Sequence, residues 1–262
     1  MLKFLLTPKW IALTIIAILL QPAFYELSQW QWRRLHQREI YNANILNNEK
    51  LNIVPLKAVI GKADSQTRNP SIKPTLEWRR ITVKGVWNSS SQVLVRKQSY
   101  ESNLGFWVIT PITDQEGNTI LVNRGWIAAN GSATTSPTVQ PLSNKQVEII
   151  GRVRIVSPRN NPKPNDLPNG QVDRIVPTEI VNSHPVVSNA YLELITTTPK
   201  PKFSDLSLIQ PPEISEGPHR SYALQWIFFA IMTVIGYTIL VRKEIQTIKE
   251  NAEKQRKANK DV

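Results

Sequence analysis

The 262-residue chain contains no cysteine. It therefore forms no disulfide, and it cannot carry the Cys-x-x-Cys motif of thioredoxin-like reductases, thiolate copper chaperones or covalently attached c-type haem. Histidine is scarce as well, because only His36, His184 and His219 are present. A structural metal site needs about four converging Cys, His or carboxylate ligands. This composition argues against such a site.

Sequence signatures of catalysis are also missing. The chain has no Gly-x-Ser-x-Gly elbow, no phosphate-binding P-loop and no Rossmann glycine pattern. No nucleophile is visibly paired with a base, and no two carboxylates are spaced for acid–base chemistry. We therefore expect a protein that is not an enzyme.

Two apolar segments lie near the ends of the chain. The second, residues 222–241, carries no formal charge, and its 20 residues make a helix of about 30 Å, the thickness of a bilayer's hydrocarbon core. The first is unbroken over 10–20 and resumes after a Gln-Pro pair. We predict transmembrane helices over 10–27 and 218–241.

The N-terminal segment also has a length that suits the apolar core of a signal peptide. A cleavable signal carries small residues before the cut in an Ala-x-Ala pattern, which the stretch LLQPAFYELS lacks. We therefore favour an uncleaved anchor over a cleaved signal.

Basic residues set the expected orientation. The 21 residues after Val241 hold seven Lys/Arg and four Asp/Glu, whereas the opposite flank, PPEISEGPHR, holds one Arg and two Glu. The positive-inside rule then places both termini, including residues 1–9, in the cytoplasm and the central part outside. The chain does not begin with a long Arg-rich presequence, which favours a bacterial plasma membrane over a mitochondrion. The net charge of +12 fits an anionic membrane surface or simple solubility, and we find no nucleic-acid motif.

The region between the spans has two expected parts. Residues 28–50 lack Pro and Gly and carry good helix formers, so the first helix is predicted to continue outside the membrane to about Asn47. From 51 to 198 the pattern changes to short β-branched and aromatic runs separated by turn residues. Strands are predicted at 53–60, 80–87, 91–97, 106–112, 119–127, 147–156, 171–176 and 190–196.

These strands predict a small β-barrel or sandwich as the extracytoplasmic domain. A Pro-rich segment over 199–217 is expected to return the chain to the membrane. Residues 242–262 are expected to form a basic cytoplasmic tail, the only long block that we expect to be disordered.

His219 stands at the start of the second apolar helix, directly after Gly217 and Pro218. The positive end of the helix dipole disfavours an imidazolium there and leaves a neutral ring nitrogen for a metal. Tyr222 and Trp226 follow at three and seven residues, on one helical stripe with small side chains. This stripe predicts a site for a planar apolar ligand such as haem. The alternative is an interfacial anchor belt with helix packing below it.

Arg34 and Arg38 lie just outside the first span, where arginine runs against the usual topology bias. Guanidinium groups pair with carboxylates through two parallel hydrogen bonds, so these residues suit haem propionates. Binding of phospholipid phosphates is an equally good interpretation. His36 emerges near the same depth and could provide a second axial ligand.

The stretch LSQWQWRRLHQR (27–38) resembles the Leu-Gly-x-Trp-Gln-x-x-Arg-x-x-x-Lys signature of the Surfeit locus protein 1 family. Ser28 replaces the Gly and Arg38 replaces the Lys. Further motifs follow in the family's order: WRRITVKGVW, VLVRK, GFWVITP, ILVNRGWI, QVDRIVP, YLELI and EGPHRSYALQW. The resemblance covers nearly the whole chain.

The resemblance implies two transmembrane helices around a β-rich outer domain. It also implies an assembly factor for haem-copper cytochrome c oxidase, which inserts or stabilises haem a in subunit I. Its partners would be subunit I, the haem a synthesis machinery and the lipid bilayer. Under this reading His219 is an axial ligand of haem iron, Tyr222 and Trp226 pack on the porphyrin, and Arg34, Arg38 or Arg220 pair with its propionates.

The alternative is a scaffold, or a resident subunit of an oxidase supercomplex, that contacts subunit I without touching haem.

One strand motif, LVNRGWI, carries a local prediction. Gly125 is expected to allow a turn or bulge, because glycine accepts positive φ. We expect Trp126 to enter the core and Arg124 to contact a neighbouring strand or a partner.

Overall fold

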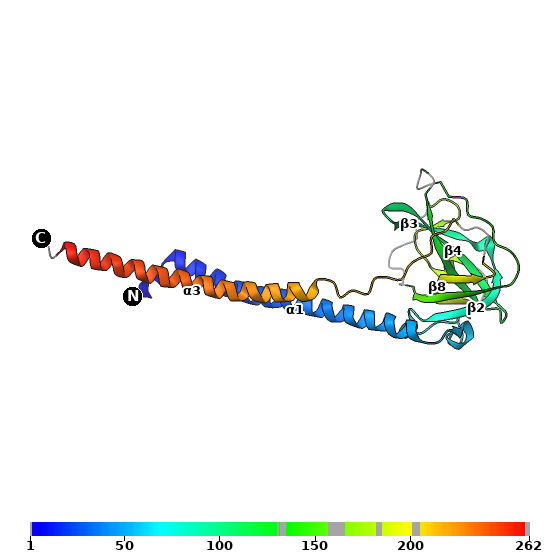
Figure 1. Ribbon diagram of the computed structural model, residues 1–262, viewed down its shortest axis with the longest axis horizontal. Helices are drawn as coiled ribbons and strands as arrows, with labels where there is room; N and C mark the ends of the chain where they lie inside the picture. Colours follow the sequence, from blue (N-terminus) through cyan, green and yellow to red (C-terminus); the bar gives the residue numbers. More distant parts are fainter. Residues whose placement is uncertain are drawn as a thin grey trace. The chain divides into compact units, whose positions relative to one another are not determined.

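The computed structural model describes residues 2–129, 131, 135–156, 166–181, 185–200 and 205–259. The chain divides into two compact units, a helical one (Met1–Asn42 with Ile214–Val262) and a β-rich one (Ala43–Glu213). The predicted fold class is confirmed, since two long apolar helices bracket a β-rich domain that forms a small closed barrel (Figure 1).

The helical unit is an antiparallel pair. After the short helix η1 (Leu2–Leu6), α1 spans Pro8–Lys50 and α3 spans His219–Ala258. Figure 1 shows the two lying side by side. The Thr14 and Tyr237 hydroxyls are 2.6 Å apart, and Ser28 Oγ donates to the Ala223 carbonyl at 3.1 Å. Both helices are long and apolar enough to cross a membrane.

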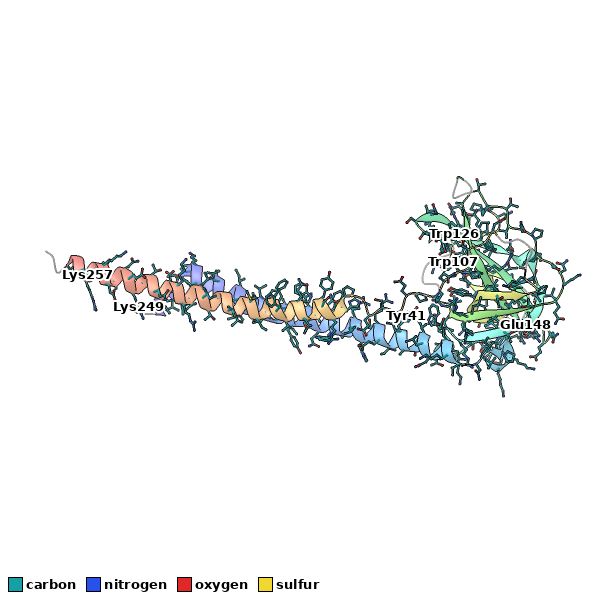
Figure 2. The ribbon with its side chains drawn as sticks, viewed as in Figure 1. Tyr41, Trp107, Trp126, Glu148, Lys249 and Lys257 are labelled. Atoms are coloured by element: carbon teal, nitrogen blue, oxygen red, sulfur yellow. The ribbon has the colours of Figure 1, made fainter. Side chains whose placement is uncertain are left out.

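Both helices extend further than the apolar segments. Pro22 lies inside α1 without ending it, as transmembrane helices tolerate. α3 continues to Ala258, so the expectation of a disordered tail was wrong. The tail is rich in Ala, Glu, Lys, Gln and Arg, which have high helix propensity, and it contains no Pro or Gly. Figure 2 labels Lys249 and Lys257 on this last part of the helix.

The β-rich unit follows the predicted strands closely. Its short helices are η2 (Leu56–Ala58), η3 (Pro74–Leu76), η4 (Ser89–Ser91) and α2 (Pro177–Ile180). Its strands are β1 (Val54–Pro55), β2 (Arg80–Trp87), β3 (Val93–Tyr100), β4 (Asn103–Asp114), β5 (Thr119–Ala128), β6 (Val147–Ile155), β7 (Gln171–Val172) and β8 (Val186–Thr198). The expected strands at 53–60 and 171–176 are much shorter than predicted, because each meets its neighbour over two residues only.

Pairing in the order β2–β6–β8–β5–β4 returns to β2 and closes the sheet into a barrel. The closing contact is antiparallel, with Gly85 opposite Asp114 and Trp87 opposite Ile112. A Cβ on Gly85 would overlap the carbonyl oxygen of Thr113, so glycine permits this close approach. Closure pairs β2 with β4 and leaves β1 and β7 at the two ends of the strand order.

Apolar side chains fill two layers. Inside the barrel, Ile81, Val83, Ile149 and Leu192 are at most 2% exposed. A second cluster, in which Leu121 and Ile109 pack with β3, β7 and α2, covers the outer face of β4 and β5. β5 is therefore buried on both faces, and its residues Ile120–Val122 are apolar in succession rather than alternating with polar ones.

The predicted irregularity at Gly125 is present. Its φ is +136°, and the register between β4 and β5 shifts there. Trp126 is buried as expected, lies opposite Trp107 (Figure 2) and donates its indole N–H to the Gln98 carbonyl at 3.0 Å. Arg124 contacts Gln92, the residue just before β3, because its Nη1 donates to Gln92 Oε1 at 3.0 Å.

A buried ion network links β6 and β8. Glu193, 2% exposed, accepts a 2.8 Å hydrogen bond from Arg154 Nη1, and its other oxygen lies 3.9 Å from Arg152 Nη1. Arg154 also reaches Glu77 at 3.3 Å and stacks over Trp78 at 3.9 Å. Burial raises the pKa of Glu193 above its ordinary value, and the two arginines oppose that shift.

Candidate functional site

The candidate site lies in the helical unit, where His219 meets Gln31. His219 is the first residue of α3, and its Nδ1 lies 2.9 Å from Oε1 of Gln31 on α1. Gln31 is buried, whereas His219 is half-buried. The antiparallel packing of the two helices therefore joins residues that are 188 positions apart in sequence.

This contact selects one tautomer of the neutral ring. An amide oxygen can only accept a hydrogen bond, so the proton must reside on Nδ1. In the neutral ring Nε2 then carries a lone pair, the form in which imidazole binds metals. Ligating histidines commonly donate their second ring N–H to an oxygen acceptor in this way.

Gly217 keeps the space beside Nε2 open. Its φ is +67°, a conformation that favours glycine, and a Cβ there would lie 3.6 Å from Nε2 of His219. Any larger side chain would reach further over the nitrogen. Gly217, two residues before the helix, thus both makes the turn and leaves the ring accessible.

Small residues let the helices approach closely next to this pair. Ser28 and Ala223 are 2% and 0% exposed, and the serine hydroxyl bonds across the interface. Small side chains at a helix contact allow the backbones to come near each other, which fixes the geometry of larger neighbours. The position of Gln31, one turn after Ser28, is set by this packing.

The aromatic residues of the predicted stripe have different surroundings. Trp226 stacks on Phe24 of α1 with ring centroids 6.0 Å apart and also meets the edge of Phe229. Tyr222 is 46% exposed. Trp226 therefore packs in the interface between α1 and α3, whereas the exposed ring of Tyr222 can contact another molecule.

The predicted arginines lie on exposed surface. Arg34 and Arg38 follow Gln31 by three and seven residues, which places them on the same side of α1. Arg34 stacks over Trp30 at 5.8 Å and donates to Gln37 at 3.4 Å. Arg220 is exposed at the start of α3. In the described residues none of the three has a carboxylate partner within ion-pair distance.

The other histidines do not join the site. His36 is exposed and lies 3.6 Å from Glu39, and it is five residues from Gln31, on another side of the helix. The structure therefore does not bring it to His219. His184 lies outside the described residues. Within the described part of the chain, no group of three or more His, Cys, Asp or Glu could hold a metal ion.

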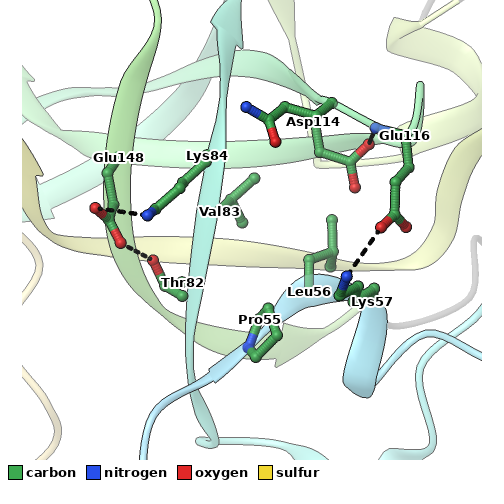
Figure 3. Close-up of a pocket in the computed structure, with 10 residues that line it drawn as sticks. Pro55, Leu56, Lys57, Thr82, Val83, Lys84, Asp114, Glu116 and Glu148 are labelled. Atoms are coloured by element: carbon green, nitrogen blue, oxygen red, sulfur yellow. Dashed lines mark hydrogen bonds and ion pairs between the residues drawn. The ribbon is translucent and has the colours of Figure 1, made fainter.

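A shallow pocket of about 320 Å³ on the barrel has its charges already paired (Figure 3). Lys57 lies 3.3 Å from Glu116, and Lys84 lies 3.6 Å from Glu148, which also accepts a hydrogen bond from Thr82. These four side chains are 43–64% exposed. The fifth charged lining residue, Asp114, accepts hydrogen bonds from the backbone N–H groups of Glu116 and Asn118. We assign this pocket no ligand.

Sequence reasoning missed Gln31 and Ser28 as site residues. Both stand in the LSQWQWRRLHQR stretch, but there they served only to identify the family. Nothing local to α1 shows which of its faces meets α3. The available signal was a small residue, Ser28, one turn before an amide, Gln31, just after the apolar part of the helix.

The model of the SURF1 family matches residues 18–231. An uncharacterised SURF1-like protein of Mycobacterium tuberculosis is 29% identical over 256 residues, covering 94% of this chain and 88% of the relative. A SURF1-like protein of Rickettsia conorii is 22% identical over 234 residues, covering 83% and 86%. The cytochrome oxidase assembly protein SHY1 of Saccharomyces cerevisiae is 26% identical over 137 residues, covering 52% of this chain and 33% of SHY1.

The family match extends from the first long helix through the barrel to the second, which is well over half of the chain. The mycobacterial relative aligns over almost the full length of both proteins. The resemblance seen in the sequence motifs is thereby confirmed, and the chain belongs to the SURF1 family.

Proposed function

We propose that this chain is a non-enzymatic assembly factor for haem-copper cytochrome c oxidase, which holds haem a for insertion into subunit I or stabilises it there. The observation that carries the proposal is the His219–Gln31 pair, which leaves one imidazole nitrogen available at the end of a membrane helix. The similarity to SHY1, a cytochrome oxidase assembly protein, supports the same function.

The residues present fit a haem as cargo. Neutral imidazole is a common axial ligand of haem iron, and here Gln31 fixes its tautomer. The exposed ring of Tyr222 lies one turn along α3 from His219 and offers a flat contact surface. The exposed guanidinium groups of Arg34, Arg38 and Arg220 suit the two propionates.

A cargo carrier must release what it binds. A single histidine ligand gives a weaker hold than a closed cage with two, and His36 lies on another side of α1 from Gln31. The half-buried ring of His219 and the side-chain-free Gly217 leave an exit on one side of Nε2. The site is therefore suited to transfer rather than to permanent storage.

The membrane arrangement belongs to the same proposal. Both helices would span a bacterial plasma membrane with both termini in the cytoplasm, as the basic flank of α3 favours. The barrel would then lie on the outer side, and His219 near the outer surface. At this location the chain would contact subunit I and the haem a synthesis machinery.

One observation favours a second function. Trp226, which a porphyrin contact would need, is stacked on Phe24. Several apolar side chains of α3, Leu224, Ile227, Phe228 and Ile231, are instead exposed. A helix surface of this kind suits contact with lipid or with another membrane protein. The chain could then hold subunit I as a scaffold without touching haem.

Deleting the gene tests the proposal. We expect membranes of the deletion strain to lose most of their haem a absorbance and cytochrome c oxidase activity, because subunit I would mature without its assembly factor. The wild-type gene should restore both, and the His219→Ala variant should restore little. Unchanged oxidase in the deletion strain would contradict the proposed function. Full rescue by His219→Ala would instead support the scaffold.

A further inference from the structure

A groove of about 660 Å³ opens on the barrel, on the side where β8 ends. Its volume is typical of sites for small molecules. Leu142, Leu194, Leu206 and Leu208 provide apolar walls, and Lys200 stands among its lining residues. The groove lies wholly within the β-rich unit and shares no residue with the His219 site.

A buried cation lines this groove. Arg124 is 8% exposed, comes from the irregular part of β5 beside Gly125, and lies 6.0 Å from the ring centroid of Trp87. The one hydrogen bond that its side chain makes in the described part of the chain joins Nη1 to Gln92 Oε1. No carboxylate of the described residues lies within ion-pair distance of it.

A buried arginine without a counter-charge is unfavourable for the folded protein. The same burial lowers the pKa of Arg124 to about 10, which still leaves the side chain charged at neutral pH. Gln92 does not depend on Arg124 for a hydrogen-bond donor, because its Oε1 also accepts a hydrogen bond from the Thr110 hydroxyl. The contacts of Arg124 with Gln92 and Trp87 thus leave its charge without a carboxylate partner among the described residues.

We propose that the groove binds an amphipathic carboxylate of the fatty-acid type. The planar carboxylate would accept two parallel hydrogen bonds from the remaining edge of the Arg124 guanidinium, the geometry that arginine favours. The hydrocarbon chain would lie along the leucine walls, and Lys200 would add positive charge. Charge complementarity selects an anion, and the apolar walls select one with a long apolar body.

Photo-crosslinking of the full-length protein in detergent tests the proposal. The probe is palmitate with a diazirine on its chain, and the cross-linked positions are read by peptide mass spectrometry. We expect labelling of peptides that contain Leu142, Leu194 or Leu206. Excess palmitate should compete, whereas hexadecanol, which has no charge, should not. Labelling of α3 by probe dissolved in the micelle provides an internal reference.

Two variants test the role of the charge. Arg124→Met should reduce groove labelling about tenfold relative to α3, since charge-assisted hydrogen bonds are lost. Its Tm should stay equal or rise, because the unpaired charge is removed. Leu208→Trp, at a position 39% exposed, should block the groove without disturbing Arg124. The proposal is wrong if Arg124→Met labels normally, if hexadecanol competes as well as palmitate, or if Arg124→Met lowers the Tm.

Discussion

The Glu193→Ala variant is expected to lose about 3–5 kcal/mol of unfolding free energy, the range measured when one partner of a buried ion pair is removed. Glu193 lies between two arginines, with Arg154 at 2.8 Å and Arg152 at 3.9 Å. Without it, Arg152 would be a buried cation with no charged partner among the described residues, because Glu77 pairs only with Arg154. A domain of ordinary stability, about 5–15 kcal/mol, would become marginal.

Urea unfolding of the full-length protein in mild detergent, followed by near-ultraviolet circular dichroism, measures this effect. Glu148→Ala is the matched control. Glu148 also pairs with a basic side chain, Lys84, but that pair is exposed and is expected to contribute less than about 1 kcal/mol. Equal stability losses in the two variants would contradict the structural role assigned to Glu193.

The Gly105→Ala variant is expected to destabilise the barrel by about 3 kcal/mol, at the upper end of the cost of overpacking a core. Gly105 pairs with Ala128 across β4 and β5. An added Cβ would overlap the carbonyl oxygen of Ile127 and would lie 2.6 Å from Cε2 of the buried Trp126. Neither neighbour can move without separating the strands or displacing a core indole.

Gly117→Ala separates this steric effect from backbone strain. Gly117 has φ +85°, but a Cβ there would meet no atom within 4 Å. Its loss should be about 1 kcal/mol, the cost of a left-handed conformation for a residue with a side chain. Thermal unfolding of both variants provides the comparison. If Gly105→Ala were the milder change, the close strand contact at Gly105 would be wrong.

Much of the fold could be predicted because the relevant signals are local. The apolar runs give α1 and α3, and the β-branched runs between turns give β2 over the same residues, 80–87, that the structure shows. The prediction of a disordered tail was wrong, since its Ala, Glu, Lys, Gln and Arg residues have high helix propensity and continue α3 to Ala258.

The order of the strands could not be predicted. The parallel pairing of β5 with β8 and the closing contact of β2 with β4 join distant segments, and neither leaves a periodic signal in the sequence. For the same reason the sequence marked Arg124 only as a contact residue, and the groove beside it was not foreseen.

The candidate site was predictable in part. His219 could be singled out because a histidine at the start of an apolar helix is unusual. Its partner Gln31 could not, because the pairing depends on which faces of two separate helices meet. Trp226 shares a helical stripe with His219, yet the structure commits its ring to Phe24. Helical spacing predicts which residues share one side of a helix. It does not predict which other residues that side contacts.

The most direct measurement is the reduced optical spectrum of the protein purified from membranes that make haem a. We predict a haem a band in the wild type and its loss in His219→Ala. Gln31→Leu should keep the ligand but lose its orienting partner, and losing such a partner typically weakens binding about 10–100-fold. A full band in His219→Ala, or no haem in the wild type, would contradict the proposal that His219 Nε2 is the ligand of haem iron.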